Sequence, residues 1–385
     1  MIKANFPIEK LKAIETPCYY YDIDLLKETL KKVKEEAEKY DYLIHYAIKA
    51  NANPRILSLI AEQGLGADCV SGGEIQAALN AGFPPQKIVF AGVGKDDWEI
   101  ALGLDHNIAC FNVESEAELN VIQEIASNKG KIANVALRIN PEIDAHTHAK
   151  ITTGMKENKF GINIGLLNDA LSELTKFKHV KLIGMHFHIG SQITDLSCFE
   201  NLAIRANEIQ DVLAMQDVQF ETVNFGGGLG IDYHHPNEFP IASFESFFST
   251  INRHFVRRKG QMVRFEPGRS IVGPCGTLIA RTIYVKEGET KNFVVLNAGF
   301  TDLMRPAMYN AYHHMENITS NEEPEVYDVV GPICESSDVF GLKVELNRVR
   351  RGDLIAIRSA GAYGEVMASQ YNCRKLPRSC FSDTL

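Results

Sequence analysis

The sequence predicts an α/β fold in which a (β/α)8 barrel is joined to a second domain built mainly of antiparallel β-strands. Between residues 42 and 267, short apolar runs rich in β-branched residues alternate with longer helical patterns. The alternation comprises eight units, and eight parallel strands are the number that closes a TIM-like barrel. After Pro267 the sequence changes to β-rich runs separated by turn residues. A doubly wound open sheet is the competing arrangement for the first part.

The barrel strands are expected in eight runs, at residues 42–49, 66–70, 87–92, 107–113, 132–140, 180–189, 220–226 and 262–267. Between them, the sequences NAG (80–82) and NKG (128–130) place glycine where helices end. Ser71 to Glu74 has the S-x-x-E pattern of a capping box.

The predicted domains are a barrel at residues 24–272 and a β domain made of residues 1–23 and 273–385. The run CYYYDI (18–23) precedes the first barrel helix and is expected to pair into the β domain. The β domain is expected to be a β-sandwich or a small β-barrel. The loop at 141–162 is long for a connection and is expected to be a lid or binding loop.

Composition limits the possible classes of function. The chain has 385 residues and a formal net charge of −9, which argues against a nucleic-acid-binding surface. It contains no apolar run of membrane-spanning length and no secretory leader pattern at its start. Its eight cysteines are scattered and include no CxxC pair, so reduced thiols are expected. Together these features predict a cytoplasmic protein.

Reactive residue types gather at the predicted carboxyl ends of the strands, where barrel enzymes place their active sites. They are Lys49, Asp68, His188, the glycine run 226–230 and the segment 266–269. A glycine run can expose backbone N–H groups to a phosphate. A lysine can form a Schiff base with an aldehyde cofactor. With a carboxylate facing the pyridine nitrogen, this set matches pyridoxal phosphate and favours chemistry through a carbanion, such as decarboxylation.

Each residue also has a structural explanation. Lys49 could be a solvated lysine, the glycine run a tight turn, and Glu266 an ion-pair partner of Arg264 two residues earlier. His186 and His188 form an HxH pair that suggests a metal, but no third ligand stands at a suitable spacing, so we expect none.

Cys334 and three pairs of histidines also have structural explanations. Cys334 beside Glu335 could be inert packing or a proton donor. The pairs 146/148, 234/235 and 313/314 are expected to be loop histidines.

The motifs resemble those of the fold type III pyridoxal-phosphate-dependent decarboxylases from about residue 16 to residue 377. Those motifs are YAIKAN (46–51), HFHIGSQ (186–192), NFGGGLG (224–230), EPGRS (266–270), GPICESSD (331–338) and GAYG (361–364). RPAMYNAYH (305–313) and the CES form of the fifth motif resemble the branch that decarboxylates meso-2,6-diaminopimelate to L-lysine and CO2, the last step of lysine biosynthesis.

The resemblance implies the alanine racemase-like fold and a role for each matching residue. Catalytic roles fall to Lys49, which carries the cofactor as a Schiff base, to Glu266 on the pyridine nitrogen, to His188 on the ring and to Cys334 as proton donor. The implied cofactor-binding residues are Lys49, Asp68, His188, Ser191, Gly227, Gly228, Glu266, Gly268, Arg269 and Tyr363. The implied substrate-binding residues are Arg269, Arg305, Tyr309, Glu335 and Tyr363. In the family, residues matching Cys334, Glu335 and Tyr363 come from a neighbouring subunit, so a homodimer with shared active sites is expected.

Other functions are separable by experiment. The nearest is a carboxynorspermidine or basic amino-acid decarboxylase of the same fold, although a diamine product would leave Arg305 without a carboxylate partner. A metal-dependent barrel hydrolase using His186 and His188 and a pyridoxal-phosphate carrier are the others. Carriers resemble the barrel alone, and the CES and GAYG motifs of the β domain speak against one.

Overall fold

A computed structural model describes residues 6–143 and 159–385, which fold into two compact units. We call residues Leu30–Gly230 and Ser243–Gly268 the barrel unit. The rest, Met1–Thr29, Ile231–Ala242 and Arg269–Leu385, is called the β unit. Residues 231–242 therefore belong to the β unit although they lie inside the range expected to form the barrel.

The barrel unit is a closed parallel barrel of eight strands, and every predicted strand is confirmed. The strands follow the order β5-β4-β3-β2-β10-β9-β8-β6, and a β5–β6 pairing closes the ring. This closure rules out the open sheet. A two-residue strand, β7 (Ile162–Asn163), extends beside β6. The barrel strands are β2 (Tyr42–Ala47), β3 (Gly66–Cys69), β4 (Ile88–Phe90), β5 (Cys110–Val113), β6 (Ala133–Asn140), β8 (Val180–His186), β9 (Thr222–Asn224) and β10 (Met262–Phe265).

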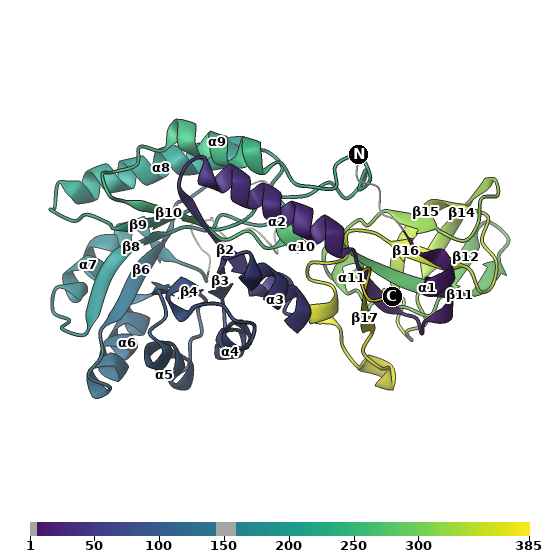
Figure 1. The fold of residues 1–385 in the computed structure, drawn as a ribbon, viewed down its shortest axis with the longest axis horizontal. Coiled ribbons are helices and arrows are strands. Elements are labelled where there is room, and N and C mark those ends of the chain that lie inside the picture. The colour runs from purple at the N-terminus through teal and green to yellow at the C-terminus, as the bar shows by residue number, and fades with distance from the viewer. Residues whose placement is uncertain (1–5, 144–158) are drawn as a thin grey trace. The chain divides into compact units, whose positions relative to one another are not determined.

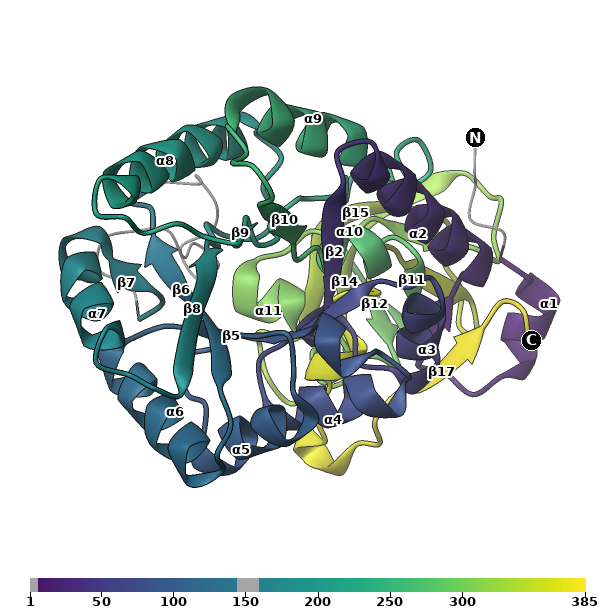
Figure 2. The ribbon, with the colours of Figure 1, turned by 60° about the vertical axis from the view of Figure 1, so that its left-hand side comes forward.

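Helices surround these strands, as Figure 2 shows. They are α2 (Ile23–Glu38), α3 (Pro54–Glu62), α4 (Gly72–Asn80), α5 (Asp97–His106), α6 (Glu116–Asn128), α7 (Leu167–Leu174), α8 (Ser197–Ala214) and α9 (Phe244–His254). Short 3-10 turns lie at η1 (Ile48–Ala50), η2 (Pro85–Lys87) and η3 (Ile164–Leu166). Phe247 of α9 packs against Phe199 of α8 at 4.6 Å and Phe265 of β10 at 5.3 Å between ring centroids, which joins both helices to the sheet.

The predicted helix ends are confirmed in part. Gly82 and Gly130 have φ values of +92° and +61°, the left-handed conformation in which glycine ends a helix. Ser71 caps α4 and accepts a hydrogen bond from the Glu74 backbone N–H. The Glu74 carboxylate, however, accepts from the backbone N–H of Val70 at 2.7 Å. The capping-box prediction is therefore correct for the serine and wrong by one residue for the glutamate.

The β unit is built on a sheet of eight strands (Figure 1). Its main path is β13-β16-β11-β12-β14-β15, and β1 pairs with β11 and β17. The pairing of β1 (Cys18–Tyr21) with β11 confirms that the early tyrosine run belongs to this domain. The other strands are β11 (Gly276–Glu287), β12 (Asn292–Leu296), β13 (Met315–Asn317), β14 (Pro324–Val330), β15 (Val339–Asn347), β16 (Leu354–Ile357) and β17 (Arg378–Phe381).

Short helices complete the β unit. They are α1 (Ile8–Ala13), α10 (Arg269–Val272), α11 (Arg305–Tyr309), η4 (Glu365–Met367) and η5 (Tyr371–Cys373). Most strand pairings are antiparallel, and only β1–β17 and β12–β14 are parallel. Across the described residues of the whole chain, no helix has the length and apolar character to cross a membrane.

Candidate active site

Lys49 and Asp68 stand side by side at the carboxyl ends of neighbouring strands. Lys49 lies in η1, directly after β2, and Asp68 lies near the end of β3. In the parallel register Ala47 pairs with Asp68, so the two residues emerge at the same level of the barrel. The Lys49 ammonium lies 3.6 Å from Asp68 Oδ2. The lysine side chain keeps 35% of its surface exposed, so its amine can be reached from solvent.

Asp68 is an unusual buried acid. Its side chain is 1% exposed, and neither carboxylate oxygen has a hydrogen-bond partner. Burial, followed by the charge of Glu266, raises its pKa well above the ordinary value, and Lys49 opposes this shift. A buried carboxyl group without hydrogen bonds is costly unless something satisfies it. The end of β3 thus presents two unsatisfied acceptors beside a lysine.

Glu266 is held in a hydrogen-bond network just after β10. Oε2 hydrogen-bonds His186 Nε2 at 2.9 Å, and Oε1 accepts from Asn224 at 2.6 Å and from Asn112 at 3.3 Å. The strand register explains the grouping, because His186 pairs with Asn224 on β9, and β9 pairs with β10. The expected alternative partner, Arg264, forms no ion pair with Glu266.

The network keeps Glu266 ionised. Burial favours the neutral acid, but the His186 ring and its hydrogen bond overcome that effect and hold the pKa of Glu266 below its ordinary value. Lys49 adds to the stabilisation of the charged form. The barrel interior therefore contains a buried carboxylate whose negative charge is fixed by its neighbours.

The segment that carries Glu266 also lies against the turn that carries Lys49. The Ala47 backbone N–H donates to the Pro267 carbonyl at 3.2 Å. A Cβ atom on Gly268 would lie 3.0 Å from the Cβ atoms of Ala47 and Ala50, which flank the lysine turn. The first and last barrel strands thus bring these two residues to one end of the barrel.

The glycine run after β9 is required by close backbone packing. A Cβ on Gly226, which has φ +69°, would lie 2.2 Å from the Phe187 carbonyl oxygen, and one on Gly227 would lie 2.3 Å from the Glu266 carbonyl oxygen. The run therefore joins the turn after β8 to the turn after β10. The tight-turn explanation accounts for these glycines, and phosphate binding stays a prediction.

His188 lies over this same turn. The backbone N–H of Gly227 donates to His188 Nδ1 at 3.4 Å. Burial first, and then the charge of Lys49, lowers the pKa of His188 well below its ordinary value. The ring is therefore neutral, with Nδ1 as acceptor and the proton on Nε2. Ser191 follows in the same loop, after Gly190.

His186 has a role that the sequence did not predict. The HxH pattern suggested only a metal ligand together with His188, whereas the structure makes His186 the partner of Glu266. Among the described residues, no three His, Cys, Asp or Glu side chains converge as metal ligands would. The alternation of side chains along β8 could have indicated this role, because it points His186 into the barrel, as it does Asn224 on β9.

In the β unit, two predicted substrate-binding arginines share one tyrosine. Arg269 donates to the hydroxyl of Tyr233 at 2.7 Å, and the Arg305 guanidinium lies 5.0 Å from the centre of the same ring. Arg269 also stacks on Tyr363 at 4.9 Å. Both arginines are 5% exposed. Among the described residues, no carboxylate lies within ion-pair distance of Arg305, so the cluster carries buried positive charge that an anion could balance.

His313 lies in the loop between α11 and β13, as predicted, but the sequence did not show its contacts. It is 1% exposed and hydrogen-bonds Arg305 at 2.9 Å and the Arg358 carbonyl at 2.8 Å. Burial and then the Arg305 charge lower its pKa to about 3, so the neutral ring accepts from the arginine. Tyr309 lies in α11, close enough to Arg269 to help raise the pKa of that arginine. Neither Tyr233 nor His313 was identified from the sequence.

Cys334 and Glu335 lie on an exposed turn between β14 and β15. The backbone N–H of Cys334 donates to Asn372 at 3.1 Å, and Glu335 accepts from the Tyr371 hydroxyl at 2.8 Å. Asp338 fixes the turn, because its carboxylate accepts from the Ile333 backbone N–H at 2.7 Å. The side chain of Cys334 is thus exposed, on a turn whose conformation is fixed by hydrogen bonds. Most of the predicted active-site loop, residues 144–158, lies outside the described residues.

The comparisons with known proteins agree with one another. The family model described as "Pyridoxal-dependent decarboxylase, pyridoxal binding domain" matches residues 23–273. The chain is 58% identical to the diaminopimelate decarboxylase of Bacteroides thetaiotaomicron over the whole of both proteins. It is 44% identical to that of Zymomonas mobilis over 97% of this chain and 89% of the relative. The crystal structure of the Helicobacter pylori enzyme complexed with L-lysine has a TM-score of 0.92 and 40% identity, covering 97% of this chain and 93% of that one.

Proposed function

We propose a function for this chain from the premise that it belongs to the family of pyridoxal-dependent decarboxylases and, within it, to the diaminopimelate decarboxylases. The proposed reaction removes the carboxyl group at the D-configured α-carbon of meso-2,6-diaminopimelate. The bond from Cα to the carboxyl carbon breaks, CO2 leaves, and one proton is added at Cα to give L-lysine. The observation that carries the proposal is the grouping of Lys49, Asp68 and the ionised Glu266 at one end of the barrel.

The residues of the barrel fit pyridoxal phosphate. Asp68 offers two buried oxygens without partners, and Glu266 offers a buried negative charge for a protonated ring nitrogen. Lys49 supplies an accessible primary amine beside them. When bound, the cofactor supplies an electron sink for the pair of electrons left on Cα. The residues that would hold it are Lys49, Asp68, His188, Ser191, Gly227, Gly228, Glu266, Gly268, Arg269 and Tyr363.

Glu266 acts through its charge. A carboxylate with a pKa below its ordinary value stays ionised at neutral pH and stabilises a cationic partner. His186, Asn224 and Asn112 fix its orientation through their hydrogen bonds. These three residues are positioning residues, because they reach the reaction only through Glu266.

The arginine cluster of the β unit suits the distal carboxylate of the substrate. Two buried guanidinium groups can bind a carboxylate through paired hydrogen bonds. Tyr233 and His313 hold them through uncharged atoms, and among the described residues no carboxylate lies within ion-pair distance of Arg305. A substrate without a distal carboxylate leaves this charge unbalanced. The cluster therefore disfavours carboxynorspermidine and the basic amino acids as substrates. Tyr309 and Tyr363 complete the proposed carboxylate site.

Cys334 and Glu335 are proposed to act from the second subunit of a homodimer. Their turn is exposed in the single chain, which leaves the thiol available to another subunit. The Cys334 thiol would donate the proton to Cα, and the Glu335 carboxylate would bind the distal ammonium. Tyr363 stacks on Arg269 of its own chain and is proposed to act beside that arginine. A cytoplasmic location is likewise a proposal.

The decisive experiment measures the CO2 released from meso-2,6-diaminopimelate, L-lysine, L-arginine, L-ornithine and carboxynorspermidine, with and without added cofactor. Formation of L-lysine is measured with meso-2,6-diaminopimelate as the substrate. We expect turnover of meso-2,6-diaminopimelate alone, and its loss in Lys49→Ala. Lys181→Ala is the matched control, because this exposed lysine pairs only with Glu221. Turnover of a different substrate, or full activity of Lys49→Ala, would reject the proposal.

A further inference from the structure

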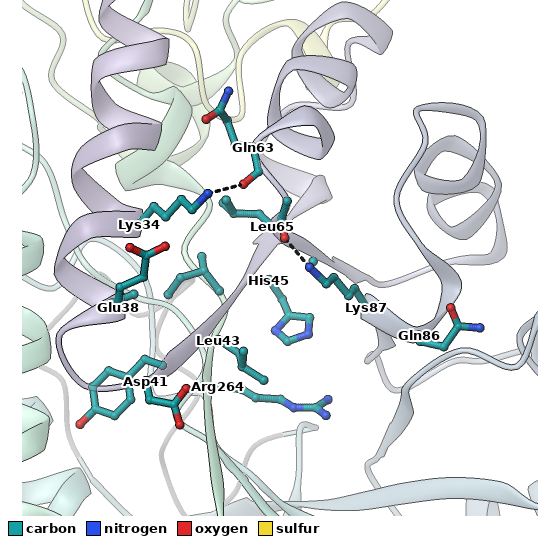
Figure 3. A pocket seen from close by; sticks show the side chains of 15 residues that line it. Lys34, Glu38, Asp41, Leu43, His45, Gln63, Leu65, Gln86, Lys87 and Arg264 are labelled. Atoms are coloured by element: carbon teal, nitrogen blue, oxygen red, sulfur yellow. Dashed lines mark hydrogen bonds between the residues drawn. The ribbon is translucent and has the colours of Figure 1, made fainter.

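A cavity opens at the amino-terminal ends of the barrel strands, opposite the candidate active site. It has a volume of about 430 Å³ and is lined only by residues of the barrel unit (Figure 3). Tyr42 and Gly66, which begin β2 and β3, belong to its lining. The candidate active-site residues instead follow the carboxyl ends of the same strands. The cavity is therefore distinct from the site described above.

Arg264 supplies an unbalanced charge to this cavity. It lies on β10 two residues before Glu266, on the same face of the strand. The residue is 8% exposed, and its Nε atom has no hydrogen-bond partner. In the described part of the chain, no carboxylate lies within ion-pair distance of its guanidinium. A buried cation without an anion is strongly unfavourable, and a bound anion would relieve that cost.

His45 adds a second unsatisfied group beside the arginine. It is 4% exposed, and its Nδ1 atom has no hydrogen-bond partner. Burial first, and then the charge of Arg264, lowers its pKa to about 3, so the ring is neutral and carries one N–H donor. The ring packs against Gly66, where a Cβ would lie 2.5 Å from His45 Cδ2. Only glycine leaves room for the ring at this position.

The other charged groups of the lining already have explanations. Lys87 donates to the Gly64 carbonyl at 2.7 Å and Lys34 to the Gln63 carbonyl at 3.3 Å, after the end of α3, as Figure 3 shows. Cations at a helix C-terminus are favourable without any ligand. Asp41 pairs with Arg257 at 2.9 Å. The acidic Glu38 is exposed at the rim.

We propose that this cavity binds a small organic carboxylate at Arg264. The planar guanidinium can take both oxygens of a carboxylate, and His45 can donate to one of them. Tyr42, Leu43 and Leu65 give the lining an apolar part that can cover a short carbon chain. That apolar part favours a carboxylic acid with a carbon skeleton over a bare inorganic anion.

The test is calorimetric titration of the holoenzyme with butyrate. Ionic strength is kept constant with chloride, and variants at Arg264 and Leu43 separate this cavity from the arginines of the candidate active site. We expect saturable binding that weakens at least tenfold in Arg264→Met, which keeps a long side chain without the charge. Leu43→Trp should weaken binding similarly by filling the cavity from its lip, where Leu43 is 40% exposed. Lys31→Ala is the control, since this lysine lies on α2 one turn before Lys34 but outside the lining.

Two results would overturn the inference. One is the absence of saturable butyrate binding to the wild-type holoenzyme. The other is unchanged affinity in Leu43→Trp, which decides the matter by itself if Arg264→Met does not fold. Both are independent of the proposed decarboxylation, because substrate turnover is measured separately on the same samples.

Discussion

Replacing His186 with leucine removes the ring that hydrogen-bonds Glu266 in the barrel. Both side chains are buried, with exposures of 2% and 4%, and their atoms lie 2.9 Å apart. Removing a hydrogen bond to a buried charged group typically costs about 1.5–3 kcal/mol, because the carboxylate is left with one fewer partner. Glu266 keeps its hydrogen bonds from Asn224 and Asn112. We therefore expect a loss of about 2 kcal/mol.

The pH dependence of that loss has a definite sign. The pKa of Glu266 lies below its ordinary value in the folded protein, so its ionisation stabilises the fold above the pKa of the unfolded chain. This contribution is lost as pH falls through the lower, folded pKa. The difference between wild type and His186→Leu should thus be complete above about pH 4.5 and shrink in more acidic solution.

The assay is urea unfolding of the cofactor-free protein, followed by circular dichroism. His254→Leu is the matched control, because His254 and Glu200 are partly exposed and lie 3.7 Å apart. An exposed pair of this kind contributes less than about 1 kcal/mol. If His186→Leu and His254→Leu lose the same free energy of unfolding to within 1 kcal/mol, about the spread of such measurements, the pairing does not stabilise the barrel as argued.

Three further predictions concern the rest of the site. Gly227→Ala should sharply weaken cofactor binding, since its Cβ would lie 2.3 Å from the Glu266 carbonyl oxygen. Gly73→Ala should not weaken it, since its Cβ would meet only a serine oxygen, at 3.7 Å. Absorbance titration with the cofactor compares the two variants. Arg305→Leu should raise KM for meso-2,6-diaminopimelate by roughly 10–150-fold, the value of a charged hydrogen bond, and an unchanged KM in steady-state assays would remove Arg305 from the carboxylate site. His313, with a pKa of about 3, should make unfolding easier as pH falls from about 6.5 toward 3, by up to about 1.4 kcal/mol per pH unit; His313→Asn should flatten that slope.

The sequence was sufficient for the barrel because its signal is local. Each strand is an apolar run bounded by helix caps, and closure follows from the number of such runs. Lys49, Asp68 and Glu266 could be identified for the same reason, since each stands at the end of a strand. The position of a residue on a strand thus predicted its place in the site.

Partnerships between distant residues could not be predicted. The sequence offered Arg264, two residues away, as the alternative partner of Glu266, but its partner His186 is 80 residues away in the chain. His313 was predicted as a loop residue, and it is one, but only the fold shows that it lies buried between Arg305 and the Arg358 carbonyl. These contacts depend on strand register and side-chain packing, which a single sequence does not specify. The Glu74 carboxylate shows the same limit locally, because its choice of Val70 over Ser71 is a matter of geometry.

A crystal structure of the holoenzyme tests the assignment of the active site most directly. We expect pyridoxal phosphate to be bound covalently to the amine of Lys49, with its ring nitrogen within hydrogen-bond distance of the Glu266 carboxylate. Attachment at a different lysine, or a ring nitrogen that faces another group, would contradict it.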